Sequence, residues 1–370
     1  MVQRQFVFHE DADVLPPLYA AVAGDSAVYL HLVRNPLAWW RLRRGQDDIG
    51  FSWRADLGQA HARVLPIPGL RRAQRLSDAV LARSFASLSA RVGEPDVVVI
   101  DSPFLSALFD QPSDALRMYY AMDPYLYYAW DSVETRARED EAMQRADLVL
   151  AVSMLLADDL RARTATPVHY LPNAVAQSFV QGAATAPGEP EALSARPPRI
   201  GCLGVLSASY DWPLIDAVAE RCPDVSFVFI GPSRPENEAA QHTIEATLAR
   251  PNVTSLGPRQ RAELPALLNA CDALWVPLRV NAHNDRRCPL RLFEYLATDR
   301  PVIATAIHEA TRLAPIVRIV TTPDDAAAAL RAAVDGTPPV DLETRRRWRL
   351  ENTWEFRANR LGGILHAARP

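Results

Sequence analysis

The chain has 370 residues, of which 49% are hydrophobic and 23% are charged, and its formal net charge is -4. At roughly 150 residues per domain this length predicts two domains, each with enough apolar residues for a core. All 40 basic residues are arginines, which excludes a Schiff-base lysine and a phosphate loop that depends on lysine, and the acidic balance argues against a general nucleic-acid binder.

Membrane insertion and secretion are not expected from the sequence. No run approaches the ~18 consecutive apolar residues of a membrane-spanning helix, and the N-terminal segment lacks the apolar stretch of a secretory signal. We therefore expect a cytoplasmic protein. Cys202, Cys222, Cys271 and Cys288 form no C-x-x-C pair, so they are expected to be buried free thiols rather than a zinc or redox site.

Strand-like and helix-like segments alternate along most of the chain. The predicted strands are residues 5–8, 27–33, 96–100, 118–121, 148–152 and 168–171, and then 199–203, 225–230, 253–256, 273–276, 301–304 and 316–320. The predicted helices between them include residues 132–145, 212–221, 236–249, 261–270 and 324–334. Short apolar strands that alternate with helices are typical of parallel sheets covered on both faces, so the predicted class is α/β.

Residues 181–198 interrupt this alternation. They read QGAATAPGEPEALSARPP, a composition rich in proline and glycine that is typical of a linker. The linker would separate a first domain, residues 1–180, from a second, residues 199–345. A terminal helical segment, residues 346–370, would pack either on its own domain or back on the first. A cleft between two such domains is a common ligand site.

The strongest local pattern is PLRLFEYLATDRPVIAT at residues 289–305. Pro289 suits the start of a helix, and Arg291 and Glu294 share one face of it. A helix start together with the forked donor of Arg291 suits a phosphate, and Glu294 could accept hydrogen bonds from a ribose diol. The alternative is an ordinary surface pair between these two side chains, worth a few tenths of a kcal/mol.

Two further segments could carry chemistry. Residues 200–212 read IGCLGVLSASYDW, a strand that runs into a loop where Gly204 and Ser207 would let a phosphate approach. This is not the dinucleotide fingerprint, and an ordinary strand–helix turn is an equal alternative. Asp123 follows the strand at residues 118–121, where a carboxylate can act as a general base; the alternative is a turn or capping residue before Pro124.

In this order, these segments resemble the nucleotide-sugar glycosyltransferases of the GT-B fold. The nearest resemblance is to the bacterial group, related to the broad family 4, that builds exopolysaccharides and teichuronic acid. It covers roughly residues 115–370. The matching segments are residues 119–123, 141–153, 172–175, 201–207, 289–305 and 353–361. The resemblance implies two Rossmann-like parallel-sheet domains that face a cleft.

The resemblance also implies roles for the candidate residues. Glu294 would hold the nucleotide ribose, Arg291 stands where the family has a diphosphate-binding lysine, and the loop with Gly204 and Ser207 would face the phosphates. Retaining relatives often have a glutamate eight residues before the ribose-binding one, where this chain has Arg286. Arg286 could add charge at the diphosphate or bind a carboxylated sugar.

Two glycines of the family motifs are also replaced in this chain. Ala174 stands in the P-N-G-V motif, and Asp299 stands in the motif at residues 289–305. These departures keep open an inactive relative that binds sugar nucleotides without turning them over.

An inverting reaction needs a base for the acceptor hydroxyl. Asp123 is the first candidate and His9, at the end of the first strand, is the second; a packed or solvent-facing histidine is the alternative for His9. The leaving diphosphate needs its developing charge neutralised, which arginine and a helix start can do. Asp11 and Asp13 form a D-x-D pair, but directly after the first strand we expect a loop or helix-start role, and no essential metal.

Residues 34–91 form a basic region, with eleven arginines and four aspartates. Trp39 and Trp40 lie beside Arg41, and arginine with interfacial tryptophan suits an anionic membrane surface. This predicts peripheral contact at the inner face of the plasma membrane and a lipid-linked acceptor. The alternative is a solvated face whose tryptophans line an acceptor groove.

Together these features predict a glycosyltransferase of the hexosyltransferase type that uses no cofactor. It would move a sugar from a UDP- or GDP-sugar to a saccharide acceptor in surface polysaccharide biosynthesis. The second domain would bind the donor and the first the acceptor. The alternatives are a catalytically inactive sugar-nucleotide-binding partner protein and a sugar-nucleotide epimerase of the same architecture.

Overall fold

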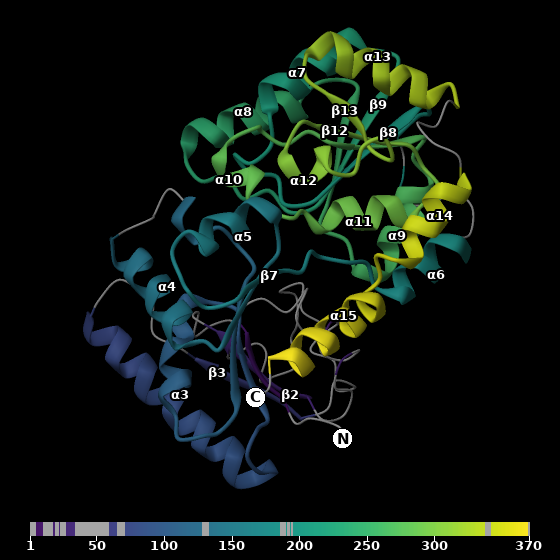
Figure 1. The fold of residues 1–370 in the computed structure, drawn as a ribbon. Helices are drawn as coiled ribbons and strands as arrows, with labels where there is room; N and C mark the ends of the chain where they lie inside the picture. The colour runs from purple at the N-terminus through teal and green to yellow at the C-terminus, as the bar shows by residue number, and fades with distance from the viewer. Residues whose placement is uncertain are drawn as a thin grey trace. The chain divides into compact units, whose positions relative to one another are not determined.

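Two parallel β-sheets organise the chain, each in a unit of its own (Figure 1). The first unit comprises Met1–Pro172 and Trp354–Pro370, and the second comprises Asn173–Thr353. The computed structural model describes residues 5–9, 18, 22, 27–33, 59–64, 71–127, 133–185, 190, 193, 195–336 and 342–368.

The sheet of the first unit has the strand order β3-β2-β1-β4-β5-β6-β7, and each neighbouring pair is parallel. Its strands are β1 (Gln5–His9), β2 (Ala27–Val33), β3 (Gln59–Val64), β4 (Val97–Ile100), β5 (Leu116–Ala121), β6 (Leu148–Ala151) and β7 (Val168–Tyr170). Every residue of β4 and β6 is buried, as expected for short apolar strands covered on both faces. The strand order reverses between β1 and β4, which makes the carboxyl ends of these strands a topological switch point.

Helices cover this sheet. They are α3 (Arg71–Val92), the 3₁₀ helices η2 (Pro103–Asp110) and η3 (Tyr125–Tyr127), α4 (Val133–Arg145), α5 (Met154–Arg161) and α15 (Trp354–Ala367). In α3, Leu81, Phe85 and Leu88 are buried, and their spacing of four and three residues places them on one face. Helix α5 starts at Ser153, whose hydroxyl accepts a hydrogen bond from the backbone N–H of Leu156 at 3.1 Å, an N-cap.

The last helix, α15, belongs to the first unit although it ends the chain. The side chain of Trp354 is buried. Arg357 donates from Nε to the carbonyl oxygen of Pro172 at 3.2 Å, and the guanidinium of Arg360 lies 6.0 Å from the ring centroid of Tyr170. These contacts attach α15 to the end of β7 and to the segment that follows it.

The sheet of the second unit has the order β10-β9-β8-β11-β12-β13, again with parallel neighbours. Its strands are β8 (Arg199–Leu203), β9 (Ser226–Ile230), β10 (Val253–Gly257), β11 (Ala273–Val276), β12 (Val302–Thr305) and β13 (Arg318–Val320). The buried rings of Phe227 and Trp275 lie 5.9 Å apart in its core. The order reverses between β8 and β11, and the predicted α/β class with two Rossmann-like parallel sheets is confirmed.

The second unit carries more helices than the first among the described residues. They are α6 (Gln177–Thr185), α7 (Trp212–Arg221), α8 (Glu238–Leu248), η4 (Arg261–Glu263), α9 (Leu264–Asn269), α10 (Ala282–Asp285), α11 (Leu290–Ala297), α12 (His308–Thr311), α13 (Pro323–Val334) and α14 (Leu342–Leu350). Asp211, Asn237 and Thr322 each accept a hydrogen bond from a backbone N–H in the first turn of the helix that they precede. These N-caps explain where α7, α8 and α13 begin.

The linker expected at residues 181–198 is wrong at its start, because α6 extends through Thr185. Phe179 and Ala183 lie one turn apart on α6 and are buried. The side-chain amide of Asn269, at the end of α9, donates to the carbonyl oxygen of Ala183. Helix α6 therefore packs on α9 inside the second unit, a long-range contact that local composition does not reveal.

Candidate functional site

The carboxyl ends of β8 and β11 lie side by side at the switch point of the second unit, where ligands bind in open α/β sheets. The segments that follow the two strands are joined to each other. Tyr210 and Leu278 form an isolated antiparallel bridge. The amide of the buried Asn284 donates to the carbonyl oxygens of Ser209 at 3.0 Å and Arg279 at 2.8 Å. The segments that follow β8 and β11 are thus bonded to each other at this edge of the sheet.

Gly204, directly after β8, lies against Arg291 of α11. The φ angle of Gly204 is +133°, which favours glycine, and its N–H donates to the carbonyl oxygen of Ile230 at 2.8 Å. A Cβ atom at this position would lie 2.3 Å from Nη2 and 2.4 Å from Cζ of Arg291. The missing side chain of Gly204 therefore makes room for the guanidinium.

Tyr210 holds the same guanidinium from another side. Nη1 of Arg291 donates to the Tyr210 hydroxyl, and Cζ lies 5.0 Å from the centroid of the tyrosine ring. The hydroxyl in turn donates to the carbonyl oxygen of Leu203 at 3.0 Å. Burial raises the pKa of Tyr210 to about 12, although the charge of Arg291 acts in the opposite direction. Tyr210 is therefore a neutral donor and acceptor that fixes Arg291.

The N-cap residue of α11 provides no side-chain cap. Pro289 occupies the N-cap position and supplies no side-chain hydrogen bond, but its carbonyl oxygen accepts one from the N–H of Leu292 at 3.0 Å. In the first turn, the N–H groups of Leu290 and Arg291 are therefore the ones that lack an acceptor within the helix. The helix is anchored to the end of β8 by Tyr295, whose hydroxyl accepts a hydrogen bond from the N–H of Leu203. A helix start beside a fixed guanidinium is suited to bind an anion such as a diphosphate.

Glu294 lies one turn further along α11 and its side chain is only 5% exposed. Its Oε1 atom lies 2.8 Å from Nη2 of Arg261 in η4. The alternative of an ordinary surface pair with Arg291 therefore does not describe this carboxylate, which is buried and paired with a different arginine. Neither Arg261 nor Tyr210 was among the residues predicted for the site.

Ser207 and Arg286 lie on the segments that follow β8 and β11. The hydroxyl of Ser207 accepts a hydrogen bond from the N–H of Ser209 at 3.2 Å, and its carbonyl oxygen accepts one from Nε1 of Trp212 at 2.8 Å. Arg286 is half-buried and donates from Nη1 to the carbonyl oxygen of Ala282 at 3.2 Å. Both residues thus contribute to the conformation of their own segments.

In the first unit, the two candidate bases lie at or just beyond the carboxyl ends of strands of the same sheet. Asp123 follows β5 and is half-buried, and its carbonyl oxygen accepts a hydrogen bond from the N–H of Tyr125 at 3.0 Å. His9 is the last residue of β1, in register with His31 of β2. In the strand order, β4 separates β1 from β5. Asp11, Asp13, Trp39 and Trp40 lie outside the described residues.

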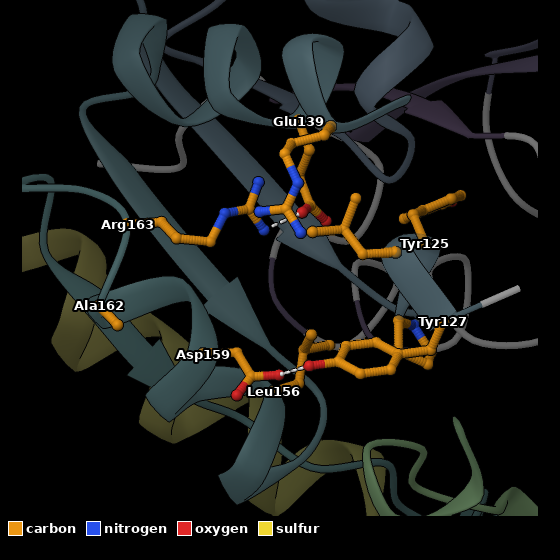
Figure 2. A pocket seen from close by; sticks show the side chains of 10 residues that line it. Tyr125, Tyr127, Glu139, Leu156, Asp159, Ala162 and Arg163 are labelled. Atoms are coloured by element: carbon orange, nitrogen blue, oxygen red, sulfur yellow. Dashed lines mark hydrogen bonds and ion pairs between the residues drawn. The ribbon is translucent and has the colours of Figure 1, made fainter. Parts of the chain in front are cut away.

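A pocket of about 220 Å³ lies between α4, α5 and η3, directly after Asp123 in the chain (Figure 2). Its lining residues are Pro124, Tyr125, Leu126, Tyr127, Arg136, Glu139, Leu156, Asp159, Ala162 and Arg163. Figure 2 shows the hydroxyl of Tyr127 directed at Asp159, to which it donates at 2.7 Å. The hydroxyl of Tyr125 donates to the carbonyl oxygen of Asp101 at 3.1 Å. The two tyrosines thus fasten the segment after Asp123 to α5 and to the end of β4.

A buried ion pair forms the inner wall of this pocket. Glu139, whose side chain is 1% exposed, accepts a hydrogen bond from Arg163, and Arg163 also donates to Asp140 at 2.6 Å. The hydroxyl of Tyr119 donates to Glu139 at 3.4 Å. Burial raises the pKa of Glu139, and the charge of Arg163 partly offsets that effect. These groups neutralise one another, so this wall of the pocket is a structural network that joins β5, α4 and the end of α5.

Other features of the described residues bear on the possible chemistry. All four cysteines are free and buried, which confirms that expectation, and burial raises the pKa of Cys271 to about 12. Within the described ranges, no group of three or more His, Cys, Asp and Glu side chains could hold a metal ion. No helix in the described part of the chain has the length and apolarity needed to cross a membrane.

A family comparison matches the part of the chain that holds this site. Residues 197–336 match the family model described as Glycosyl transferases group 1. This region is therefore similar to the group 1 glycosyltransferases. It contains every site residue of the second unit named above, among them Gly204, Tyr210, Arg261, Arg291 and Glu294.

A curated relative also carries the name of a glycosyltransferase. The putative teichuronic acid biosynthesis glycosyltransferase TuaH of Bacillus subtilis (strain 168) is 24% identical over 181 residues. The match spans 48% of this chain and 45% of the relative, so it covers about half of each protein. The resemblance expected from the sequence is confirmed.

Solved structures of similar fold match nearly the whole chain. Sucrose-phosphate synthase from Thermosynechococcus elongatus has a TM-score of 0.75 at 15% identity and covers 99% of this chain and 100% of its own. Anabaena HepE, solved in complex with UDP and glucose, has a TM-score of 0.67 at 15% identity, with 99% and 100% coverage. A trehalose-phosphate synthase from Burkholderia xenovorans, in complex with glucose-6-phosphate, has a TM-score of 0.66 at 17% identity, with 98% and 100% coverage. The GT-B fold is thereby confirmed.

Proposed function

We propose that the chain is a glycosyltransferase that moves a hexosyl group from a UDP- or GDP-sugar to a saccharide acceptor in surface polysaccharide biosynthesis. The observation that carries the proposal is the contact of Arg291 with Gly204 at the switch point of the second unit. It places a fixed cation beside an uncapped helix start. The group 1 match and the relative named for teichuronic acid biosynthesis support the reaction class, and the UDP bound to HepE supports the donor class.

The residues of the second unit would act on the donor. The diphosphate leaving group gains negative charge as the glycosidic bond breaks, and Arg291 with the start of α11 would stabilise that charge. The backbone at Gly204 would let the phosphates approach closely, with Ser207 further along the same loop. Glu294 would accept hydrogen bonds from the ribose, and Arg286 would add charge near the diphosphate. Arginine thus supplies charge that a metal ion supplies in other transferases.

The first unit would bind the acceptor. Asp123 would take the proton of the attacking hydroxyl if the reaction inverts configuration, with His9 as the second candidate. The protein would act in the cytoplasm, and the basic region at residues 34–91 would bring it to the inner face of the plasma membrane, where a lipid-linked acceptor resides. Flotation with anionic vesicles at low salt tests this membrane contact, and failure to bind would defeat it.

Nucleotide binding tests the central assignment. Thermal-shift screening of the full chain against UDP, GDP and their sugars should identify the base. Glu294→Ala should then weaken binding of that nucleotide by about 1–3 kcal/mol, since it removes buried hydrogen-bond acceptors. Asp216→Ala is the control, because Asp216 of α7 pairs with Arg250. Equal affinities of the wild type and the Glu294 variant would remove Glu294 from the site.

Turnover separates this proposal from two rivals. The glutamate that retaining relatives often carry is Arg286 here, which favours an inactive sugar-nucleotide-binding partner protein as the main rival. Slow hydrolysis or transfer from a bound donor sugar, lost in Asp123→Asn while nucleotide affinity persists, would exclude it. A sugar-nucleotide epimerase would instead interconvert donor sugars with no acceptor present.

A further inference from the structure

Arg261, like Tyr210, is a residue of this site that the sequence did not predict. It begins the short helix η4, far along the chain from α11. Its Nη2 atom lies 2.8 Å from Oε1 of Glu294, and the two side chains are 45% and 5% exposed. The pair therefore joins a buried carboxylate to an arginine that reaches it from the surface.

Three elements of the second unit set the position of Arg261. The guanidinium lies 5.9 Å from the ring centroid of Phe179 on α6, within the range of a cation–π contact. The start of η4 is fixed by a capping box, in which the N–H of Gln260 donates to Glu263 at 2.8 Å. Helix α6 is itself held on α9. Arg261 is thus placed between an aromatic ring and the carboxylate of Glu294.

This arrangement has a direct consequence for Glu294. A buried carboxylate without a cation is strongly disfavoured in its ionised form. A paired one can stay ionised, and a carboxylate can accept about four hydrogen bonds, so contact with one guanidinium does not exhaust it. The ionised, oriented form is the one that would accept hydrogen bonds from a ribose diol.

We propose that Arg261 is a positioning residue that orients the carboxylate of Glu294 toward the ribose of the donor. This inference rests on the function proposed above, in which Glu294 binds the ribose. Arg261 acts through Glu294 and not on the reacting atoms. Its loss should therefore weaken recognition of the ribose hydroxyls and leave the contacts of Arg291 with the diphosphate in place.

Calorimetric titration of the full chain tests this role, with UDP and 2′-deoxy-UDP as probes, or the guanosine pair if the thermal-shift screen returns GDP. The wild type should prefer the ribonucleotide. Arg261→Gln should weaken ribonucleotide binding about ten-fold and reduce its preference over the deoxy form, whereas Arg261→Lys should restore most of the preference. In the Glu294→Gln background, Arg261→Gln should have little further effect, because its target has been removed.

A matched control separates positioning from general damage. Arg250→Gln breaks an ion pair with Asp216 of similar length in the same unit, and it should leave both nucleotide affinities unchanged. If Arg261→Gln weakens both probes equally, or weakens neither, the positioning role is overturned. If Arg261→Gln does not fold, Arg261→Met takes its place, because it also removes the charge: it should weaken binding of the ribonucleotide more than binding of the deoxy form, and equal weakening of both would overturn the role. A wild type that binds neither UDP nor GDP would instead overturn the proposed function itself.

Discussion

The guanidinium of Arg291 occupies the space that a side chain on Gly204 would need, since a Cβ there would lie 2.3 Å from Nη2. The φ angle of Gly204, +133°, also disfavours other residues. One small substitution can therefore disturb both the backbone after β8 and the cation of the proposed diphosphate site.

Gly204→Ala should reduce both stability and nucleotide affinity. Backbone strain at such a φ angle costs of order 1–3 kcal/mol, and displacement of Arg291 should weaken UDP or GDP binding about ten-fold. Gly336→Ala is the control, because Gly336 also has a positive φ angle, +87°, but a Cβ there would meet nothing within 4 Å. Melting temperatures and titrations should show a stability loss in both variants and an affinity loss in the first alone. Equal nucleotide affinities of the wild type and Gly204→Ala would show that the Gly204–Arg291 contact does not contribute to nucleotide binding.

Tyr210→Phe should release Arg291 from its hydroxyl partner. The variant loses the hydrogen bond to the carbonyl oxygen of Leu203, so we expect a stability loss of about 1–3 kcal/mol together with weaker nucleotide binding. Tyr120→Phe, in the first unit, removes a comparable buried hydrogen bond to the carbonyl oxygen of Leu171 at 2.8 Å. Denaturant unfolding should show both losses, and only Tyr210→Phe should alter the titration with nucleotide.

Arg163→Leu should strongly destabilise the first unit, because it leaves Glu139 buried without its cation. Removal of one partner from a buried pair costs about 3–5 kcal/mol; the 17% exposure of Arg163 places the loss at the lower end. Without Arg163, burial should raise the pKa of Glu139 further. The folded state then holds a proton that the unfolded state releases, so the stability deficit should grow as pH rises above the ordinary range of a glutamate.

The double variant Glu139→Gln with Arg163→Leu provides the control for that pH dependence. It removes the ionisable group, so its free energy of unfolding should vary with pH much less than that of Arg163→Leu between about pH 4.5 and about pH 7.5, a range that lies above the ordinary glutamate pKa of about 4.3. Parallel pH profiles for the single and double variants would contradict the assignment of the effect to Glu139.

Asp299, which replaces a family glycine, should contribute to stability in a pH-dependent way. Burial alone would raise its pKa, but the hydrogen bond from Arg349 at 2.8 Å and the charges of Arg349, Arg346 and Arg345 lower it overall. The contribution of the Asp299 carboxylate to the free energy of unfolding is therefore fully present above the ordinary pKa of an aspartate. It is lost as the pH falls through the lowered pKa of Asp299 in the folded state. Since the side chain of Asp299 is 49% exposed, Asp299→Asn should cost under about 1 kcal/mol at neutral pH. Acid titration should show the variant and wild type converging at low pH.

Much of the fold could be predicted from apolar strands that alternate with helices, but β3 and α3 were missed. Residues 59–64 read QAHARV, with one large apolar residue, and they form a strand because they pair in register with β2. The helical spacing of Leu81, Phe85 and Leu88 was present in the sequence, but that region was interpreted only as a basic surface.

The site was predictable only where its residues are local. Arg291, Glu294 and Tyr295 share a helix face, so their spacing could identify them. Tyr210 contacts Arg291 across 81 residues of sequence, and such a contact depends on the packing of α11 against the end of β8. The partner of Glu294 could not be read from spacing for the same reason, and the structure supplied it.

Helix α15 makes the first unit discontinuous along the chain. The second unit is the uninterrupted stretch Asn173–Thr353, whereas the first unit combines Met1–Pro172 with Trp354–Pro370. Cleavage of the backbone between Thr353 and Trp354 would therefore divide the first unit and leave the sequence of the second unit intact.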